Sequence, residues 1–385
     1  MKTLRDVNVK NKRILVRADF NVPLENGEII DNFKIEAVLP TIKYLLDQNA
    51  KIILLTHLGR PNGRVVEELR VDNLAQKFSE LIDRPVKKLN DCIGLEVEKE
   101  IEEMNSGQII FLENVQFHSG EKEKSQEFIK SLAKLADVFV MEAFGQAHRD
   151  YASISGVPKE IPSCAGLLFE KEIKNLSKVL NNSEHPLTVV IGGAKISTKI
   201  RMIKNFLKKA DDLILGGALA NVVIAAKGFA IGKSKIEENM VEGIKKMELT
   251  NIKLHIPVDV IVSDDYSGKS FANVSPVGRT KENEIILDIG PDTIDLFKDI
   301  IKQSKTIIWN GPMGLLESER FSNGSERIAE AIANSDGFSV VGGGESIILL
   351  NRLGIKDKID HISIGGGAML SFLAGEKLPG IEALE

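Results

Sequence analysis

The sequence is short of several features whose presence would mark particular protein classes. Cys92 and Cys164 are the two cysteines in 385 residues, and they lack metal-ligand spacing. We therefore expect neither a zinc site nor a structural disulfide. No apolar stretch approaches the roughly 20 residues that cross a bilayer, and the polar start Met1 to Asp6 lacks a signal peptide's apolar core. These absences predict a cytoplasmic protein without a membrane partner.

The charge balance also argues against one class of partner. The formal net charge is −5, which disfavours a nucleic-acid binder that relies on a broad basic surface. Hydrophobic residues make up 43% of the chain and charged residues 27%, as in ordinary soluble globular proteins. A chain of 385 residues is too long for one typical core, so we expect two domains.

Short apolar strands alternate with amphipathic helices along most of the chain. In the first half we expect strands at 13–16, 52–55, 109–112 and 138–141, and helices at 36–48, 71–81 and 128–136. This alternation predicts an α/β fold with parallel sheets and helices on both faces. In such sheets, ligands bind beyond the carboxyl ends of the strands.

A domain boundary is expected where glycine and proline gather, at residues 156–166. A helical pattern over 167–180 follows, and a second α/β block begins at Leu187. We therefore predict two doubly wound, Rossmann-like domains, one over 1–166 and one over 187–366. A connecting helix within 167–186 would join them.

Four glycine-rich turns follow apolar strands in the second half of the chain. They are Gly192-Gly193-Ala194-Lys195, Asn310-Gly311-Pro312-Met313-Gly314, Gly342-Gly343-Gly344-Glu345-Ser346 and Gly365-Gly366-Gly367-Ala368. Such turns let backbone N–H groups and helix N-termini approach a phosphate. A single turn would be weak evidence, because glycines also serve tight turns without a ligand. Several in one half of the chain favour a nucleotide site.

Two lysines strengthen that interpretation. Lys195 and Lys199 are four residues apart, and we predict that both lie on one face of a helix that opens after Gly193. Together they can neutralise a polyphosphate, and Lys199 can also reach a transferring phosphoryl group. The alternative is a solvated basic first turn, which the helix dipole disfavours.

Three further residues of this half are candidates for nucleotide or metal binding. Glu345 begins the helix after three glycines. It either complements the helix dipole or holds Mg²⁺, which prefers oxygen ligands. Asn310 and Glu317 flank the Gly311 turn and can hold the phosphate and the ribose.

The first half ends its strands in basic and polar residues instead. Arg17, His57, Arg60, His148 and Arg149 all follow expected strands. If they converge, they suit a small anion, because guanidinium groups bind carboxylate and phosphate in bidentate fashion. The alternative is that each arginine caps a helix or pairs with a surface carboxylate.

Together these segments resemble phosphoglycerate kinase, in the family's order and over essentially the whole chain. The matching motifs include Arg17-Ala-Asp-Phe-Asn-Val-Pro, His57-Leu-Gly-Arg-Pro, Glu113-Asn114, Ala143-Phe-Gly-Gln-Ala-His-Arg149, Pro257-Val-Asp259, Asp288-Ile-Gly-Pro, Trp309-Asn-Gly-Pro-Met-Gly and Leu378-Pro-Gly380. The resemblance implies reversible phosphoryl transfer between ATP and the carboxylate of 3-phosphoglycerate. It also implies two domains that close on each other, with residues 367–385 returning to the first.

The resemblance assigns roles to individual residues. The acid would contact Arg17, Asp19, Asn21, His57, Arg60, Gln116, His148 and Arg149. ATP or ADP would contact Gly193, Lys195, Lys199, Gly217, Asn310, Pro312, Glu317, Gly342, Gly343, Gly344 and Ser346. Lys199, Lys34, Gly343 and Gly366 would serve catalysis, and Glu345 would hold Mg²⁺. We expect a monomer with a small anionic substrate and no nucleic-acid partner.

Several positions depart from the family pattern. Lys34 and Gln116 replace arginines, Glu345 replaces the magnesium aspartate, and Thr198 and Ile364 replace an acid and a threonine. Glu142 replaces an aspartate, which is a milder change. Lysine keeps the charge of arginine but not its bidentate fork.

Three hypotheses about function follow. The chain is a phosphoglycerate kinase with a divergent site, a related kinase that phosphorylates another small carboxylate, or a weakly catalytic relative that binds nucleotide for regulation. Retention of Lys195, Lys199 and Asn310 argues against the third.

Overall fold

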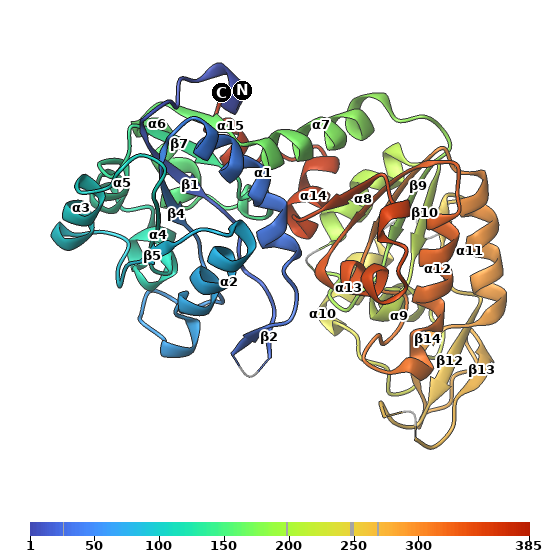
Figure 1. Cartoon of the computed structure of the whole chain (residues 1–385). Helices are drawn as coiled ribbons and strands as arrows, with labels where there is room; N and C mark the ends of the chain where they lie inside the picture. The colour runs from blue at the N-terminus through green and yellow to red at the C-terminus, as the bar shows by residue number, and fades with distance from the viewer. Residues whose placement is uncertain (26, 198, 247–249, 268) are drawn as a thin grey trace. The chain divides into compact units, whose positions relative to one another are not determined.

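A computed structural model describes residues 1–25, 27–197, 199–246, 250–267 and 269–385 (Figure 1). The chain forms two compact units: Met1–Asn175 with Glu376–Glu385, and Leu176–Gly375. We call them the acid unit and the nucleotide unit, after the predictions above. Their boundary falls inside helix α7 (Leu167–Asn182). The sequence had suggested boundaries at 166, 187 and 367. Within the described residues, no helix has both the length and the apolar character to cross a bilayer.

A six-stranded parallel sheet forms the centre of the acid unit. Its strands lie in the order β5-β6-β4-β1-β7-β8. Their bounds are β1 (Arg13–Arg17), β4 (Lys51–Leu55), β5 (Val86–Lys88), β6 (Ile109–Phe111), β7 (Val138–Met141) and β8 (Ser163–Ala165). Strands β4, β5 and β6, which follow β1 in the sequence, all lie on one side of it. Strands β7 and β8 lie on the other side. The carboxyl ends of β1 and β7 therefore flank the crevice where ligands bind in doubly wound sheets.

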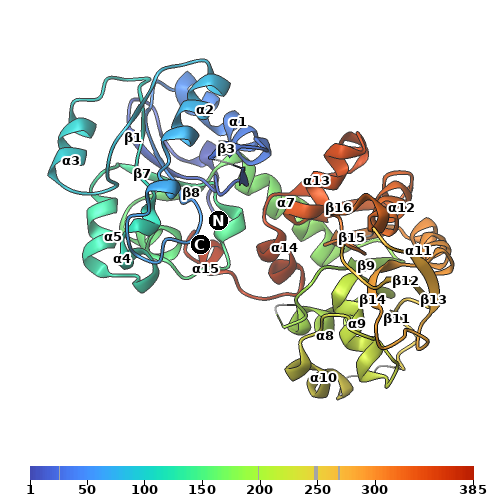
Figure 2. The same cartoon turned by 90° about the horizontal axis from the view of Figure 1, so that it is seen from below.

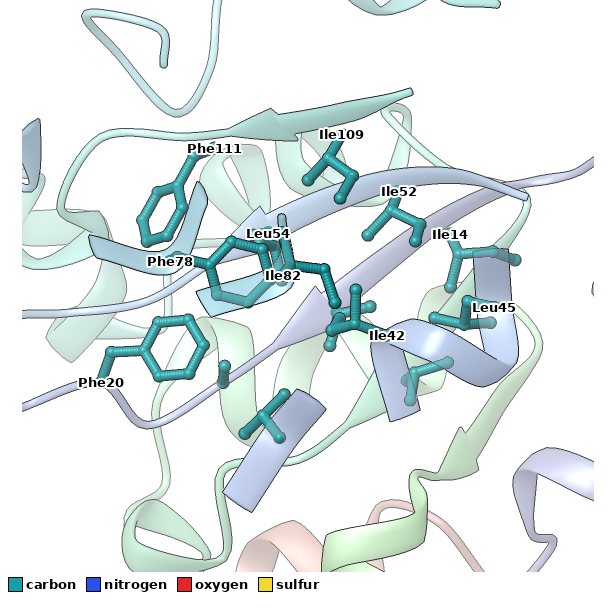
Figure 3. Packing of buried hydrophobic residues seen from close by; sticks show 14 of the residues in the cluster. Ile14, Phe20, Ile42, Leu45, Ile52, Leu54, Phe78, Ile82, Ile109 and Phe111 are labelled. Carbon is teal, nitrogen blue, oxygen red and sulfur yellow. The ribbon is translucent and has the colours of Figure 1, made fainter. Parts of the chain in front are cut away.

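Helices cover both faces of this sheet because side chains alternate along each strand. On one face, Ile14, Ile52 and Ile109 pack against α1 (Phe33–Asp47) and α2 (Asp72–Ile82), as Figure 3 shows. In the same core, the rings of Phe20, Phe78 and Phe111 lie 5.9–6.2 Å apart between centroids. The other helices of the unit are α3 (Leu95–Glu102), α4 (Ser119–Glu123), α5 (Gln126–Ala133) and α6 (Val157–Glu160). A short hairpin pairs β2 (Leu24–Glu25) with β3 (Glu28–Ile29).

The last residues of the chain belong to the acid unit, and both termini lie there (Figure 2). Helix α15 (Pro379–Glu382) anchors this return. The Gly380 N–H donates to the carbonyl of Ala147 at 2.9 Å, and Leu378 and Leu384 are buried.

A second six-stranded parallel sheet forms the nucleotide unit, in the order β11-β10-β9-β15-β16-β17. The strands are β9 (Leu187–Ile191), β10 (Asp212–Leu215), β11 (Leu254–His255), β15 (Thr306–Asn310), β16 (Phe338–Gly342) and β17 (His361–Ser363). In chain order this is the 3-2-1-4-5-6 arrangement of dinucleotide-binding folds, with its switch point between β9 and β15. The predicted fold class, two doubly wound parallel-sheet domains, is confirmed.

Helices also cover both faces of the second sheet. Val190, Trp309 and Val341 pack with α11 (Pro291–Gln303), α12 (Asn323–Ala333) and α13 (Gly344–Arg352) on one face. The remaining helices are α8 (Ile200–Lys209), α9 (Gly217–Ala226), α10 (Glu238–Lys245) and α14 (Gly366–Leu373).

The nucleotide unit also carries a three-stranded antiparallel sheet that the sequence pattern did not reveal. It pairs β12 (Asp259–Ser263) with β13 (Asn273–Pro276) and β14 (Ile285–Ile289). The described residues between these strands form no helix, so the alternation used for the other sheets gave no signal here.

The structure corrects one prediction about local structure. Lys195 and Lys199 do not share a helix face, because α8 begins only at Ile200. Gly193 has φ +98°, and the carboxylate of Glu237 accepts hydrogen bonds from the N–H and hydroxyl of Ser197. This distant partner satisfies backbone groups that a helix would otherwise use. Thr198 lies outside the described residues.

Buried carboxylates hold the N-termini of several helices. Glu142, directly after β7, accepts from the N–H groups of Leu168 at 3.3 Å and Phe169 at 2.8 Å, at the start of α7. The hydroxyl of Thr41 on α1 also donates to Glu142. The same arrangement recurs in the nucleotide unit, where Asp259 accepts from the first turn of α11 and Asp288 from that of α12.

We expect the substitution Glu142→Gln to become progressively more favourable to stability as the pH rises. Burial raises the pKa of Glu142 from 4.5 to about 7. The stability contribution of this carboxyl is therefore complete below pH 4.5 and is lost as the pH rises through 7. Glutamine does not ionise, so the variant should gain about 3 kcal/mol relative to the natural chain between pH 4.5 and 8.

Denaturant unfolding of both proteins at several pH values measures this difference. The exposed substitution Glu127→Gln on α5 controls for the removal of one carboxylate. A stability difference that stays constant from pH 5 to 8 would show that Glu142 ionises without penalty, contrary to expectation.

Candidate active site

The predicted acid-binding residues lie on neighbouring loops of the acid unit. Arg17 is the last residue of β1, and Asp19 and Asn21 follow that strand. His57 and Arg60 follow β4, Gln116 follows β6, and His148 and Arg149 follow β7. Lys34 occupies the first turn of α1. Because the carboxyl ends of parallel strands meet at one edge of a sheet, these loops are neighbours.

Asp19 is the centre of a charged group at this edge. Its carboxylate accepts from Lys34 Nζ at 3.1 Å and lies 4.0 Å from His57 Nδ1. Burial opposes its ionisation, but Lys34, His57 and Arg17 together lower the pKa of Asp19. This ion pair fixes the ammonium of Lys34 beside the loop after β1.

Arg17 lies beneath this group, with 0% of its surface exposed. Its Nε donates to the hydroxyl of Ser153 at 2.8 Å, and that hydroxyl donates to Glu121 at 2.6 Å. Nη2 lies 3.5 Å from His57 Nδ1. In this state the guanidinium can influence a bound acid through its charge and through His57, and it offers no surface for contact.

The two histidines of the site are neutral near pH 7. Burial lowers the pKa of His57 to about 3, and the cations Arg17, Lys34 and Arg149 act in the same direction. Burial and Arg149 lower the pKa of His148 to about 4. Both rings therefore offer hydrogen bonds to a ligand and add no positive charge.

The loop after β4 connects the remaining acid-site residues. The side-chain oxygen of Asn21 accepts from the Gly59 N–H at 2.9 Å, and the Gly63 N–H donates to the carbonyl of Gln116 at 3.1 Å. Arg60 lies between these two anchors and is exposed. Gln116 is only 4% exposed, and its Oε1 has no hydrogen-bond partner among the described residues.

A cavity of about 440 Å³ opens over the switch point of the nucleotide unit. It is lined by the predicted nucleotide-binding residues Gly193, Lys195, Gly217, Pro312 and Glu317, and by the predicted metal ligand Glu345. Most of its wall is apolar, from Ile285, Leu287 and Met313 among others, as expected for a site that holds a flat aromatic base.

Backbone hydrogen bonds join the glycine turns to one another beside this cavity. The Gly193 N–H donates to the Pro312 carbonyl at 2.8 Å, and the Gly217 N–H donates to the Met313 carbonyl at 2.8 Å. A Cβ at Gly192 would overlap the Pro312 carbonyl oxygen. The close approach of these turns therefore requires glycine.

Lys199 projects into the gap between two of the turns. Its Nζ donates to the Gly192 carbonyl at 2.6 Å and would lie 3.0 Å from a Cβ at Gly311. Burial lowers the pKa of Lys199 to about 8, although Glu345 opposes this effect. The ammonium therefore contacts neutral backbone groups, and the negative charge of Glu345 offsets only part of the cost of its burial.

The turns after β15, β16 and β17 also contact one another. Asn310 Nδ2 donates to the Gly342 carbonyl at 2.8 Å, and the Gly311 N–H donates to the hydroxyl of Ser346 at 3.1 Å. A Cβ at Gly366 would approach Gly343 Cα to 2.9 Å. Gly343 and Gly366 are therefore in direct contact, and Gly344 starts α13.

Two of the carboxylates that line the cavity, those of Glu317 and Glu345, interact electrostatically. Desolvation and the neighbouring Glu317 raise the pKa of Glu345, while Lys199 lowers it. Glu317 and Glu345 both line the cavity. A divalent cation would offset their mutual repulsion, so this pair suits a magnesium ion better than Glu345 alone does.

Sequence reasoning missed other residues that line the cavity. Lys235 and Tyr266 belong to its wall, and Lys235 Nζ lies 5.3 Å from the centre of the Tyr266 ring. Leu287 comes from β14, in the antiparallel sheet that was not predicted. Recognising that sheet would have identified this wall, but no pattern around Lys235 distinguished it from a surface lysine.

Among the described residues, one group of side chains in the acid unit has the composition of a metal site. Ligand atoms of Asp91, Cys92 and His118 lie within 4.8 Å of one another, although the cysteine spacing gave no hint of it. One carboxylate oxygen of Asp91 lies 2.6 Å from His118 Nε2 and accepts from the Cys92 N–H at 2.6 Å. These hydrogen bonds account for the arrangement without an ion.

A sequence model of the phosphoglycerate kinase family matches residues 4–376. The phosphoglycerate kinase of Moorella thermoacetica is 46% identical over 386 residues, covering 99% of this chain and 98% of the relative. That of Dictyoglomus turgidum is 47% identical over 387 residues, with coverage of 99% and 98%.

Solved structures agree with the sequence comparison. The chain matches phosphoglycerate kinase from Pyrococcus horikoshii OT3 with a TM-score of 0.89 and 36% identity, covering 100% of this chain and 98% of that one. It matches phosphoglycerate kinase from Coxiella burnetii with a TM-score of 0.84 and 38% identity, with coverage of 99% and 98%.

We expect affinity for MgADP to fall as the pH rises above about 8. The pKa of Lys199 is about 8, and bound phosphates would raise it again, so that binding and protonation are linked. Calorimetric titration from pH 6.5 to 9.5 should show constant affinity below pH 7. Above pH 8 the affinity should decline by up to about tenfold per pH unit.

The same titration of Lys199→Met provides the control. The variant should bind more weakly at pH 7 and lose the pH dependence between 8 and 9.5. An unchanged pH dependence in Lys199→Met would assign the titration to another group.

Proposed function

The chain belongs to the phosphoglycerate kinase family, and we propose that it is itself a phosphoglycerate kinase. It transfers a phosphoryl group reversibly between ATP and the carboxylate of 3-phosphoglycerate. The observation that carries this proposal is the position of Lys199, an ammonium group held among glycine turns beside a cavity of nucleotide size.

The acid unit supplies hydrogen bonds and positive charge for a small acid. Arg60 and Arg149 offer guanidinium groups suited to phosphate and carboxylate. Neutral His57 and Asn21 orient the ligand through hydrogen bonds. Lys34, held by Asp19 at 3.1 Å, supplies a cation for the reacting carboxylate and the phosphoryl group, although it lacks a bidentate fork.

The nucleotide unit supplies backbone donors and lysines for the polyphosphate. The turns at Gly193, Gly217, Gly311 and Gly343 surround the position where the phosphates would bind, with Lys195 at the rim. The base would occupy the apolar end of the cavity, between Leu287 and Met313. Because the two ligands bind different units, turnover requires them to meet.

Transfer needs little covalent help from the protein. The migrating phosphoryl group carries negative charge on its equatorial oxygens, so fixed cations and backbone donors lower the barrier. Lys199 from the nucleotide unit and Lys34 from the acid unit would take this role. The N–H groups at Gly343 and Gly366 would stabilise the same charge.

Mg²⁺ is the expected cofactor, and the residues present fit it. Glu345 is the candidate ligand, and Glu317 adds a second carboxylate whose repulsion a divalent cation would relieve. When bound, the ion would neutralise charge on the nucleotide phosphates. Cytoplasmic location and a monomeric state stay predictions.

We expect the purified chain to phosphorylate 3-phosphoglycerate with MgATP. A coupled assay that consumes the acyl phosphate measures the rate, and a panel of other small carboxylates tests the rival hypothesis of a related kinase. Turnover of 3-phosphoglycerate at least about 100-fold faster than any other acid fits the proposal, since 1.4 kcal/mol of discrimination is worth tenfold. Preference for a different acid would refute it.

We expect Lys199→Ala to lower kcat by about 100- to 1,000-fold, as for loss of a donor to developing charge. Affinity for MgADP should change by about tenfold at most, because the backbone donors persist. Lys208→Ala, at the far end of α8, serves as the matched control and should leave both constants unchanged. A change confined to KM would make Lys199 a binding residue only.

A further inference from the structure

Helix α4 lies between the two loops that carry the acid-site arginines. On one side, Lys122 Nζ donates to the side-chain oxygen of Asn62 at 2.7 Å, two residues after Arg60. On the other side, Lys124 Nζ donates to Asp150 at 2.5 Å, directly after Arg149. The segment after Gln116 therefore bridges both arginine loops.

Close packing fixes α4 against the loop of Arg60. The Gly63 N–H donates to the carbonyl of Gln116 at 3.1 Å. A Cβ at Gly63, where φ is +77°, would come 2.9 Å from the Cβ of Ser119. A side chain at position 63 would force these segments apart, so this glycine keeps Lys122 next to the loop of Arg60.

Lys122 of α4 and Lys124, which directly follows this helix, differ in their electrostatic state. The partner of Lys124 is a carboxylate, which cancels its charge. The partner of Lys122 is a neutral amide oxygen, which accepts one hydrogen bond and leaves the positive charge in place. An ammonium group has three donors, so two donors of Lys122 remain for another acceptor.

The charge at this edge of the site is otherwise low for a dianionic phosphate. Gln116 follows β6 at the base of the segment and carries no charge, and His57 and His148 are neutral because burial lowers the pKa of both. Arg17 is fully buried. Arg60 and Arg149 would thus be left to balance the phosphate unless a further cation contributes.

We propose that Lys122 binds the phosphate end of the acid and supplies the charge that Gln116 lacks. This assignment rests on the proposed function, and it makes Lys122 a determinant of specificity for phosphorylated acids. The side chain of lysine is flexible, so Nζ of Lys122 can contact the phosphate and still donate one hydrogen bond to Asn62.

Calorimetric titration of the full chain with 3-phosphoglycerate tests the role of Lys122. Lys122→Met should weaken binding about tenfold, as expected for one charge-assisted contact, and should raise KM with kcat unchanged. Affinity for glycerate, the same acid without the phosphate, should stay constant. Lys130→Met, an exposed lysine on α5, controls for the lost charge and should bind like the natural chain.

A second variant separates charge compensation from a structural effect. Gln116→Arg should restore affinity in the Lys122→Met background and should gain much less in the natural chain. Equal gains in both backgrounds, or unchanged binding of 3-phosphoglycerate by Lys122→Met, would overturn the assignment. Absence of turnover in a natural chain that still binds 3-phosphoglycerate through Lys122 would refute the kinase function and leave the assignment standing.

Discussion

The architecture depends on buried carboxylates that accept hydrogen bonds from the first N–H groups of helices. The pairs are Glu113 with the residue preceding α2, Glu142 with α7, Asp259 with α11 and Asp288 with α12. Glu113 and Glu142 follow strands, Asp259 starts β12 and Asp288 lies near the end of β14. The interaction therefore joins a sheet to a helix that begins at a distant point of the chain. The unpaired N–H groups and positive end of a helix make a carboxylate the natural partner.

This constraint separates structural acids from site residues among the family motifs. Asp259 and Asp288 accept hydrogen bonds from backbone groups of α11 and α12, although Asp288 also borders the cavity. A glycine stands where each cap is tightest, because a Cβ at Gly290 or Gly324 would overlap the carboxylate. The acid unit uses the opposite chemistry at its ligand edge, where side-chain cations outnumber acids. The acids that cap helices are engaged by backbone N–H groups. The two ligand edges therefore differ in which charged side chains they still offer to a ligand.

Sequence patterns predicted those features that depend on residues close together in the chain. The strand that ends at Arg17 and the strand that precedes Gly192 consist mostly of branched apolar residues, so their placement and the parallel fold were predictable. The interval between Lys195 and Lys199 suggested a helix, but Glu237 draws that segment into another conformation from 40 residues away. The role of Lys235 and the burial of Arg17 also depend on distant partners, which spacing alone does not encode. The predicted ligand contacts themselves stay predictions.

The return of residues 376–385 to the acid unit has a consequence for how the protein is made. A ribosome releases residues 176–375 before residues 376–385, so the nucleotide unit has its whole sequence available first. The acid unit has its sheet after residue 165 but lacks α15 until Pro379–Glu382 has also emerged. During translation the backbone carbonyl of Ala147, next to His148, therefore cannot accept its hydrogen bond from the Gly380 N–H until residue 380 has emerged. The contacts that hold the loop after β7, which carries His148 and Arg149, are therefore completed late in folding.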